Sequence, residues 1–543
     1  MAVLRGSWRA ALRMGLGLVL VLGGFGTGAA HASSSDGAAA LVVHTDRGTV
    51  AGMYSGDARA FLGIPYAAPP IGALRWRPPQ PAARWSGVRQ ATQPGSACAQ
   101  TGSPVSGVPA TTTSEDCLYL NVYTPRHERG RRLPVMVWIH GGAFTGGTGS
   151  DYDGAAIAAK GDVIVVTINY RLSAFGFLAL PALDNEGGAD SSGDFGLLDQ
   201  QAALRWVQHN AAAFGGDARN VTEFGESAGA ASVCANMASP PAAGLFARAI
   251  AESGCLIPLT SRQAGEVQGT ALAASLGCAD PAAAAACLRA KPAADILTAE
   301  GSQSWSPTDG GPTLPLQPPQ AFIAGRYNHV PLLQGTNHDE GRFFVALQFD
   351  AQGSPLTAAG YPGALAAIFG PTAVSFIAGE YPLADFASPD LALAAVQTDG
   401  EFACPALLAD RLAAGSGVYG YEFSDPSPPN FLPLHPTFPL GAAHSLELQY
   451  VFQRVPLFDT VPSFTPAQLV LSDQIIRYWT AFAATGNPNG GNGNSRPAPG
   501  LAPWPAFTAQ QPQIQELVPG GVATVPAADF ATDHRCAFWS GGS

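Results

Sequence analysis

The stretch from Val221 to Ala230 contains a serine whose surroundings suit nucleophilic chemistry. It reads Val-Thr-Glu-Phe-Gly-Glu-Ser-Ala-Gly-Ala, which predicts a strand, a tight turn and a helix, with glycines on either side of Ser227. Small residues at these positions let strand and helix approach closely, so the serine is held out toward a substrate. The amides at the start of the helix would stabilise an oxyanion there. Because the chain has 64 glycines, this spacing alone is weak, and the interpretation requires a base, an acid and further oxyanion donors.

The strand before this serine belongs to a series of strands and helices that alternate along the chain. Continuous apolar runs at 135–139 and 163–168 are typical of strands in a sheet covered on both faces. The patterns also predict a short helix over 155–160 and a long helix over 197–214. This alternation favours a parallel sheet with helices on both sides. Further strands are predicted at 118–122, 249–251, 330–334 and 418–423, and an amphipathic helix at 469–484.

Other segments are predicted to lie outside the sheet. Residues 258–331 are mostly helical and are interpreted as an insertion over the sheet, and residues 351–413 form an alanine-rich helical region. Residues 61–78 include a proline-rich stretch, so we expect an irregular segment that wraps the surface and adds little to the core. Residues 486–505 are interpreted as a linker before a short C-terminal segment.

The composition fits one large globular domain. Of the 543 residues, 47% are hydrophobic and only 13% are charged, which allows a large core and argues against general disorder. The net charge of −12 provides no basic stripe to neutralise phosphates, so no nucleic-acid partner is expected. We predict a single domain over residues 33–543.

Residues 1–32 have the pattern of a secretory signal peptide. Several arginines precede an apolar run from Met14 to Phe25, and Ala30-His31-Ala32 provides a cleavage site of small residues. The apolar run of about a dozen residues is shorter than the roughly 20 that a bilayer span requires, and no later run is longer than that limit. We therefore expect a secreted or periplasmic protein, with no membrane partner after cleavage.

All eight cysteines follow this leader. An even number of cysteines in an oxidising compartment predicts disulfides, although the sequence alone leaves their pairing open. None of their spacings matches a zinc ribbon or finger, so no metal site is predicted.

Eight motifs in order along the chain resemble one family, the type-B carboxylesterases, which are relatives of the cholinesterases with the α/β-hydrolase fold. They cover nearly the whole chain after the leader, so the set is far more specific than any single motif. The leader makes the chain similar to a secreted, bacterial-type member. The motifs are Phe-Leu-Gly-Ile-Pro-Tyr at 61–66, Glu-Asp-Cys-Leu-Tyr-Leu-Asn-Val at 115–122, His-Gly-Gly-Ala-Phe at 140–144, Asn-Tyr-Arg at 169–171, Gly-Leu-Leu-Asp-Gln at 196–200, Gly-Glu-Ser-Ala-Gly at 225–229, Asp-Glu-Gly at 339–341 and Gly-Ala-Ala-His at 441–444.

The resemblance implies an α/β fold, the α/β-hydrolase, with a large, mostly parallel central sheet, helices on both faces and helical insertions over its C-terminal edge. It also implies three catalytic side chains. Ser227 would be the nucleophile, which needs a base because an alcohol is almost fully protonated at neutral pH. His444 would be that base in preference to His435, and Glu340 would orient its imidazole, with Asp339 as the alternative.

The resemblance further implies an oxyanion hole of backbone amides from Gly142, Ala143 and Ala228. Ala143 stands where many relatives have glycine, which keeps the N–H but restricts the backbone. Loss of one such donor typically costs about 3 kcal/mol of transition-state stabilisation. Glu226, next to the nucleophile, would either hold the catalytic residues in position without contacting the substrate or bind buried water, and we favour the first role.

The resemblance also implies structural pairs. Two ion pairs, Arg75 with Glu115 and Arg171 with Asp199, would belong to the scaffold. Cys234 and Cys255 depart from the usual family pattern, so they remain open as either a fourth disulfide or two buried thiols. The implied disulfides join Cys98 to Cys117, Cys278 to Cys287, and Cys404 to Cys536.

The loop over residues 99–116 bears on the substrate. In relatives that hydrolyse acetylcholine, an aromatic side chain in this loop attracts the quaternary ammonium, and here the loop has no Trp, Tyr or Phe. A general carboxylic ester hydrolase acting on a small-molecule ester, without metal or organic cofactor, is therefore expected. The alternatives are a lipase-like enzyme, a hydrolase of a bulky natural ester such as a toxin side-chain ester, and a non-catalytic binding protein. Nothing in the sequence indicates an oligomeric state.

Overall fold

The computed structural model describes residues 41–102, 111–127, 130–184, 192–454, 461–490 and 500–541. They belong to one compact unit, Leu41–Ser543. The predicted leader, residues 1–32, lies outside the described residues.

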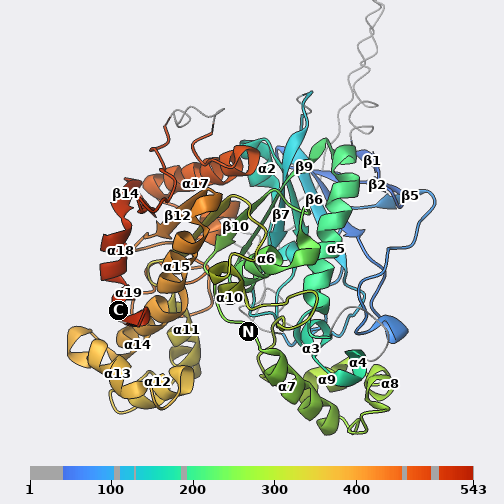
Figure 1. Ribbon diagram of the computed structural model, residues 1–543. Helices are drawn as coiled ribbons and strands as arrows, with labels where there is room; N and C mark the ends of the chain where they lie inside the picture. Colours follow the sequence, from blue (N-terminus) through green and yellow to red (C-terminus); the bar gives the residue numbers. More distant parts are fainter. Residues whose placement is uncertain are drawn as a thin grey trace, which may run out of the picture. The chain divides into compact units, whose positions relative to one another are not determined.

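An 11-stranded sheet forms the centre of this unit, in the order β14-β13-β12-β11-β10-β9-β7-β8-β6-β4-β3 (Figure 1). Its middle strands, from β8 to β13, pair in parallel, and its two margins pair antiparallel. A separate 3-stranded sheet has the order β1-β2-β5. The strands are β1 Val42–His44, β2 Thr49–Ala51, β3 Met53–Ser55, β4 Ala58–Pro65, β5 Val88–Gln90, β6 Tyr119–Pro125, β7 Leu133–Ile139, β8 Ile164–Ile168, β9 Gly216–Glu226, β10 Arg248–Glu252, β11 Leu332–Asn337, β12 Val418–Phe423, β13 Gln513–Leu517 and β14 Ala523–Pro526.

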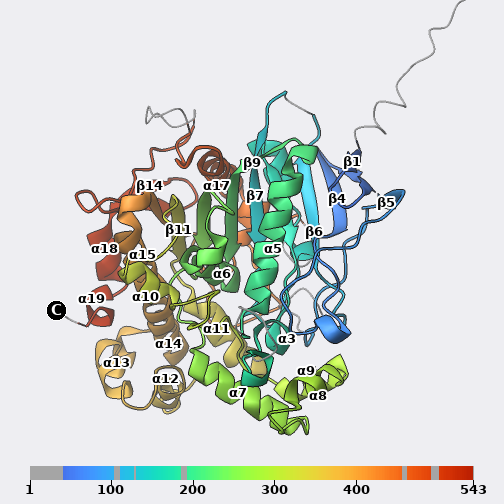
Figure 2. The same cartoon turned by 45° about the vertical axis from the view of Figure 1, so that its right-hand side comes forward.

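Strand β7 shows how the sheet is covered on both faces. Val135, Val137 and Ile139 face one hydrophobic core, while Met136 and Trp138 face another, because successive side chains of a strand point to opposite sides. The first core includes α5 (Phe195–Asn210), α6 (Ala228–Ala238) and α15 (Cys404–Ala413), and the views show α5 and α6 along one face of the sheet (Figures 1 and 2). The second core includes α2 (Ala155–Gly161), α16 (Leu448–Phe452) and α17 (Pro466–Thr485). The mostly parallel α/β-hydrolase sheet that the sequence predicts is therefore confirmed.

Helical insertions follow the carboxyl ends of two neighbouring strands. One lies between β10 and β11 and the other between β11 and β12, and Figure 1 shows α7–α9 and α11–α14 at the same end of the sheet. The first insertion contains α7 Arg262–Ser275, α8 Ala284–Arg289, α9 Ala293–Glu300 and α10 Pro318–Ile323. The second begins with α11 Gly341–Gln348, α12 Tyr361–Phe369, α13 Val374–Glu380 and α14 Pro389–Gln397. The remaining helices are α3 Ser173–Phe177, α4 Pro181–Asp184, α18 Ala527–Asp533 and α19 Cys536–Trp539.

The expectation of an irregular surface segment over 61–78 is wrong for its first five residues, 61–65, which belong to β4. Strand β4 runs antiparallel to β6, and Phe61 and Ile64 on it are completely buried. The pairing register shifts between these two residues, where Gly63 has φ +69° and lies against the backbone of Gln93. This bulge breaks the alternation of buried and exposed side chains, so the sequence pattern does not reveal the strand.

The C-terminal segment after the predicted linker also forms part of the sheet. Strand β13 pairs in parallel with β12, and β14 pairs antiparallel with β13. Their sequences, Gln-Ile-Gln-Glu-Leu and Ala-Thr-Val-Pro, are short and partly polar, as is usual at a sheet edge. Strands of this kind carry too weak a hydrophobic pattern to be predicted from sequence alone.

Four disulfides join the chain. They include the three pairs that the resemblance implies, Cys98–Cys117, Cys278–Cys287 and Cys404–Cys536. The structure also joins Cys234 to Cys255, the pair that the sequence leaves open. Bonds of this kind are typical of secreted or extracellular proteins.

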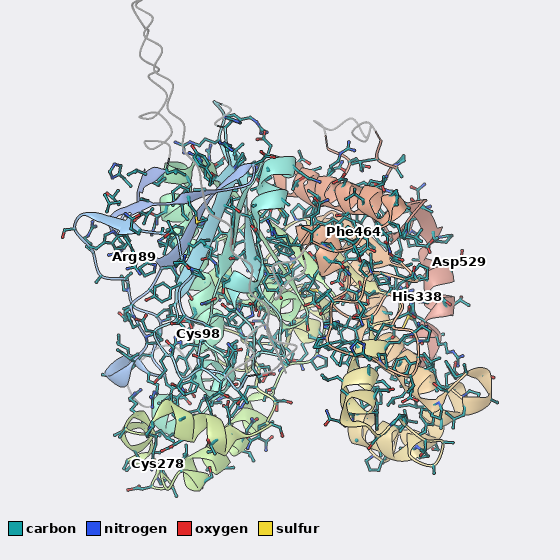
Figure 3. The ribbon with its side chains drawn as sticks, turned by 180° about the vertical axis from the view of Figure 1, so that it is seen from behind. Arg89, Cys98, Cys278, His338, Phe464 and Asp529 are labelled. Atoms are coloured by element: carbon teal, nitrogen blue, oxygen red, sulfur yellow. A yellow bond between two sulfur atoms is a disulfide. The ribbon has the colours of Figure 1, made fainter. Side chains whose placement is uncertain are left out.

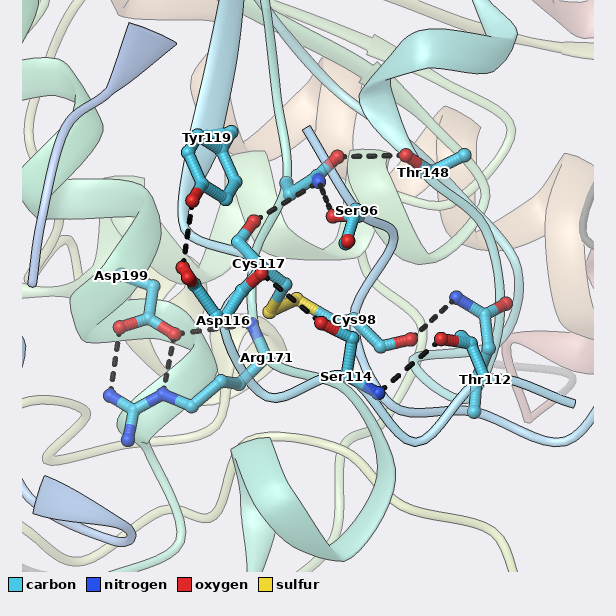
Figure 4. Close-up of a disulfide and its surroundings, with 12 residues drawn as sticks. Ser96, Cys98, Thr112, Ser114, Asp116, Cys117, Tyr119, Thr148, Arg171 and Asp199 are labelled. Atoms are coloured by element: carbon cyan, nitrogen blue, oxygen red, sulfur yellow. Dashed lines mark hydrogen bonds and ion pairs between the residues drawn. A yellow bond between two sulfur atoms is a disulfide. The ribbon is translucent and has the colours of Figure 1, made fainter. Parts of the chain in front are cut away.

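Two buried ion pairs support the first disulfide. Arg171 contacts Asp199 through two nitrogens, at 2.7 and 2.8 Å, close to the Cys98–Cys117 bond (Figure 4). Arg75 reaches Glu115 with Nε at 2.7 Å from Oε2. Two parallel N–H bonds to one carboxylate fix both side chains, so the Arg75–Glu115 pair holds the C-terminal end of the loop over residues 99–116.

In the ranges described, no single helix is long and apolar enough to cross a membrane. Two consecutive helical segments joined at a sharp bend, Tyr361–Phe369 and Val374–Asp385, are together long and apolar enough, by length and composition only.

Candidate active site

Ser227 occupies a sharp turn between β9 and α6. Its φ of 57° and ψ of −123° lie outside the regions that a non-glycine residue normally adopts, and its amide donates to the carbonyl of Glu252 at 2.9 Å. A Cβ at Gly229 would lie 2.0 Å from the carbonyl oxygen of Ile139, and one at Gly225 would lie 2.6 Å from the same atom. Only glycine fits at either position, so these residues let β9 and α6 hold the serine in its strained conformation. Ser227 remains partly exposed, as a nucleophile must be.

The turn after β7 faces this serine. A Cβ at Gly141 would lie 3.1 Å from the Cβ of Ser227, and Gly142 and Ala143 follow with φ values of 99° and 53°. Both residues are exposed, and their N–H groups donate no hydrogen bond to any described residue. Ala228 begins α6, where the first amides of a helix also lack an internal acceptor. The three amides that the resemblance implies are thus free to bind an oxyanion.

Glu340 and His444 form a buried pair. Nδ1 of His444 lies 2.6 Å from Oε2 of Glu340, and both side chains are almost fully buried. The second oxygen of Glu340 accepts hydrogen bonds from the hydroxyl of Thr336 at 2.9 Å and from the amide of Asn337 at 2.7 Å. These donors fix the carboxylate, which in turn fixes the imidazole with its proton on Nδ1.

The two alternatives from the sequence lie in different surroundings. Asp339 forms an ion pair with Arg342 at 2.8 Å and accepts a hydrogen bond from the amide of Ala442 at 2.9 Å. His435 is exposed in the loop after β12. Neither residue takes part in the Glu340–His444 contact, so the geometry favours that pair over both alternatives.

The other imidazole nitrogen, Nε2 of His444, faces the residue before the serine. It lies 3.1 Å from Oε1 of Glu226, and the same oxygen accepts a hydrogen bond from the hydroxyl of Ser445 at 2.8 Å. Among the residues described, no hydrogen bond joins the Ser227 hydroxyl to His444. Hydrogen bonds between catalytic groups are often long or poorly aligned without substrate and tighten when it binds.

Burial and charge act in opposite directions at this centre. Burial disfavours the charged imidazole, but the carboxylates of Glu226 and Glu340 outweigh it and raise the pKa of His444. Burial raises the pKa of Glu226 to about 6, although His444 and the Ser445 hydroxyl favour its charged form. Burial likewise raises the pKa of the neighbouring Glu252 to about 8. At neutral pH Glu226 is therefore mostly charged, while Glu252 is mainly neutral.

Three aromatic side chains that the sequence analysis missed surround His444. The ring centroids of Phe344, Phe402 and Phe343 lie 4.8, 5.2 and 5.7 Å from that of the imidazole. Phe343 and Phe344 are partly exposed, whereas Phe402 is buried. Phe343 and Phe344 follow Glu340 by three and four residues on α11. This spacing is about one helical turn, so both side chains lie beside Glu340. This spacing is the sequence signal that could have predicted Phe343 and Phe344 at the site. The three aromatic side chains provide an apolar wall for a substrate.

Known proteins match this chain over most of its length. The Carboxylesterase family model matches residues 39–539. Human cocaine esterase is 36% identical over 89% of this chain and 86% of its own length, and para-nitrobenzyl esterase of Bacillus subtilis (strain 168) is 37% identical over 82% and 90%. A solved thermophilic PNB esterase is 33% identical, with a TM-score of 0.75 over 91% of this chain and 99% of its own. The chain therefore belongs to the carboxylesterase family and is a carboxylic ester hydrolase with the α/β-hydrolase fold.

Proposed function

We propose that this enzyme hydrolyses carboxylic esters through an acyl-enzyme intermediate formed on Ser227. His444 takes the proton of the Ser227 hydroxyl as the oxygen attacks the ester carbonyl, and it then gives that proton to the departing alcohol. A water molecule, activated by His444 in the same way, hydrolyses the acyl-enzyme. Glu340 stabilises the imidazolium that forms in each step.

The amides of Gly142, Ala143 and Ala228 are proposed to bind the oxyanion of both tetrahedral intermediates. Glu226 is proposed to add a second negative charge beside the imidazolium. Its contact with Nε2 also means that the imidazole must turn or shift slightly toward Ser227 when substrate enters.

The single observation that carries this proposal is the buried 2.6 Å contact between Glu340 and His444, next to a serine held at φ 57°. A carboxylate that fixes the proton of an imidazole on Nδ1 leaves Nε2 as a base. The strained serine is partly exposed, whereas both partners are buried. A non-catalytic member of the fold would have no need for this combination.

We propose a small-molecule ester with an apolar group as the substrate class. The wall of Phe343, Phe344 and Phe402 supports this choice, because aromatic side chains bury large apolar areas. Relatives named cocaine esterase and para-nitrobenzyl esterase are consistent with small esters that carry aromatic groups. We also propose export, supported by the leader pattern and by four disulfides.

A panel of p-nitrophenyl esters with acyl chains of increasing length tests both the mechanism and the substrate. We expect the highest kcat/KM with short chains and a loss of kcat of about 10⁶-fold in Ser227→Ala, as is typical when the nucleophile of a serine hydrolase is removed. Unchanged turnover in Ser227→Ala, with the fold verified by circular dichroism, would refute the mechanism. A kcat/KM that rises steadily toward long chains would instead support the lipase-like alternative.

A further inference from the structure

A cluster that contains two histidines lies at the C-terminal side of the sheet, away from Ser227. His338 follows β11, and Asp533 and His534 lie at the end of α18. Figure 3 labels His338 beside the helix that carries Asp529, one turn before Asp533. One ligand atom from each of His338, Asp533 and His534 lies within 4.8 Å of the other two. The fold thus brings together two imidazoles and a carboxylate from segments almost 200 residues apart in sequence, the separation of His338 and Asp533 being 195.

Each imidazole already has a carboxylate that can hold one of its protons. Nδ1 of His338 lies 3.2 Å from Oδ1 of Asp339, and Nε2 of the same ring lies 3.2 Å from Oδ2 of Asp533. His534 lies between Asp399 and Glu422, with its two nitrogens 2.8 and 2.7 Å from their oxygens. A histidine that binds a metal almost always donates its other N–H to such a partner, which fixes the ring and its tautomer.

The separation of His338 and Asp533 suits a small divalent ion, and His534, within 4.8 Å of both, is close enough to join them after a small movement. Ligands at about 2.0–2.1 Å from Zn²⁺ in a tetrahedron lie about 3.3 Å apart, close to the 3.2 Å between His338 and Asp533. Glu422 is 2.7 Å from His534 and would need to move back only slightly to share an ion. Nitrogen and oxygen ligands in this combination favour zinc and similar metals over Mg²⁺ or Ca²⁺, which prefer oxygen.

The local charge also favours a cation. Carboxylates face the cluster from five segments of the chain, and they belong to Asp339, Asp399, Glu422, Glu516 and Asp533. The permanent cation that pairs directly with one of them is Arg342, 2.8 Å from Asp339. A divalent ion that displaces the protons shared by the imidazoles and carboxylates would offset part of this negative charge.

The cluster is both accessible and held in place. It borders a cavity of about 270 Å³, and the side chains of His338 and Asp533 are 41% and 63% exposed, so an ion can enter from solvent. His534 is only 4% exposed, and it lies two residues before Cys536, which is bonded to Cys404. The amide of His338 donates to the carbonyl of Phe423 at 3.0 Å. One ligand is thus rigid and buried, while the exposed pair can close over an ion.

We propose that His338, Asp533 and His534 bind one divalent transition-metal ion, with Zn²⁺ as the best fit, and that Glu422 or water completes the coordination. The ion would tie α18 to the ends of β11 and β12. It would have no part in ester hydrolysis, because none of these side chains contacts Ser227 or His444 among the described contacts.

Isothermal titration of the full chain with ZnCl₂ tests this proposal. The protein should be treated with chelator, dialysed and free of any polyhistidine tag. We expect about one zinc ion per chain, a rise in Tm with zinc but not with equal MgCl₂, and visible absorption bands of a tetrahedral site when CoCl₂ replaces zinc. Asp533→Asn should weaken zinc binding by about tenfold or more. Asp529→Asn, a change of the same kind at an exposed position on α18, should leave it unaltered.

Each other outcome would overturn the proposal. No binding heat and no cobalt bands would mean that the two imidazoles are held by the carboxylates alone, as hydrogen-bonded or ion-paired groups. One zinc ion bound equally by Asp533→Asn would place the ion elsewhere on the chain. Equal loss of binding in Asp529→Asn would indicate a nonspecific effect of surface charge. Because the readouts are binding, Tm and absorption, they are independent of esterase activity.

Discussion

Two of the buried histidines in the described part of this enzyme, His444 and His534, have similar immediate partners and different surroundings. His444 lies between Glu340 and Glu226, and His534 lies between Asp399 and Glu422. Beside His444 are a strained serine and amides without acceptors, whereas beside His534 are a second histidine and an exposed aspartate. The same structural unit, a histidine between two carboxylates, therefore occurs at two places in this molecule. The groups next to the histidine and its two carboxylates decide whether the imidazole can act as a base or as a metal ligand.

The largest effect should separate the two histidines. We expect His444→Gln to lower kcat/KM by about 10⁵-fold or more, because glutamine cannot accept the serine proton. The same change at His534 should act on stability, lowering the free energy of unfolding by about 1–3 kcal/mol as a buried carboxylate loses its partner. Ester hydrolysis assays and urea denaturation measure the two quantities.

His435→Gln is the control for this comparison, since this histidine is exposed and should leave both kcat/KM and unfolding unchanged. A loss of kcat/KM in His534→Gln as large as that in His444→Gln would show that the two sites do not differ in the way described.

A smaller effect should come from the second carboxylate beside His444. Glu226→Gln removes a negative charge that raises the pKa of His444, so that pKa falls. The base is active when neutral, and the acid limb of the kcat/KM profile should therefore move to lower pH. We also expect kcat on the plateau to fall about tenfold, which corresponds to about 1.4 kcal/mol of lost stabilisation of the imidazolium. A pH series of initial rates measures both changes.

Glu252→Gln is the matched control. The pKa of Glu252 is about 8, so its side chain is mainly neutral over the acid limb, and glutamine resembles that form. The acid limb should stay in place in this variant. If Glu226→Gln also left the limb unmoved, Glu226 would be a scaffold residue without electrostatic influence on His444.

The smallest effect on turnover should come from the disulfides, one near Ser227 and one near His534. Cys255 lies in the loop after Glu252, whose carbonyl accepts from the Ser227 amide, so Cys234→Ala/Cys255→Ala should lower kcat a few-fold. The loop between these cysteines, with a separation of 21, predicts a loss of about 3 kcal/mol of stability in urea denaturation.

Cys404→Ala/Cys536→Ala opens a loop with a separation of 132, which predicts a larger loss of about 5 kcal/mol. It should leave kcat nearly unchanged but weaken zinc binding, because Cys536 anchors the segment of His534. If this pair reduced kcat more than the Cys234–Cys255 pair, the two centres would be coupled through the sheet.

Much of the fold could be predicted because its signals are local. The apolar strand β7 and the strand β12 lie where the sequence places them, as do helices α2 and α17. The sequence pattern misses strand β4 because the bulge at Gly63 interrupts its alternation, and it misses β13 because that strand is short and partly polar, next to the edge strand β14. Such strands exist only because a neighbouring strand supplies their hydrogen bonds.

The sequence by itself determined the family, the order of the motifs and the candidate chemistry of Ser227, Glu340 and His444, because glycines, prolines and short motifs act on their immediate neighbours. Only the tertiary structure showed that a second carboxylate, that of Glu226, meets the same imidazole, and that His534 lies between Asp399 and Glu422. The Glu226–Ser445 bond spans 219 residues of chain and the His534–Asp399 contact spans 135. Contacts over such separations depend on how the whole sheet packs, and no local pattern in the chain records them.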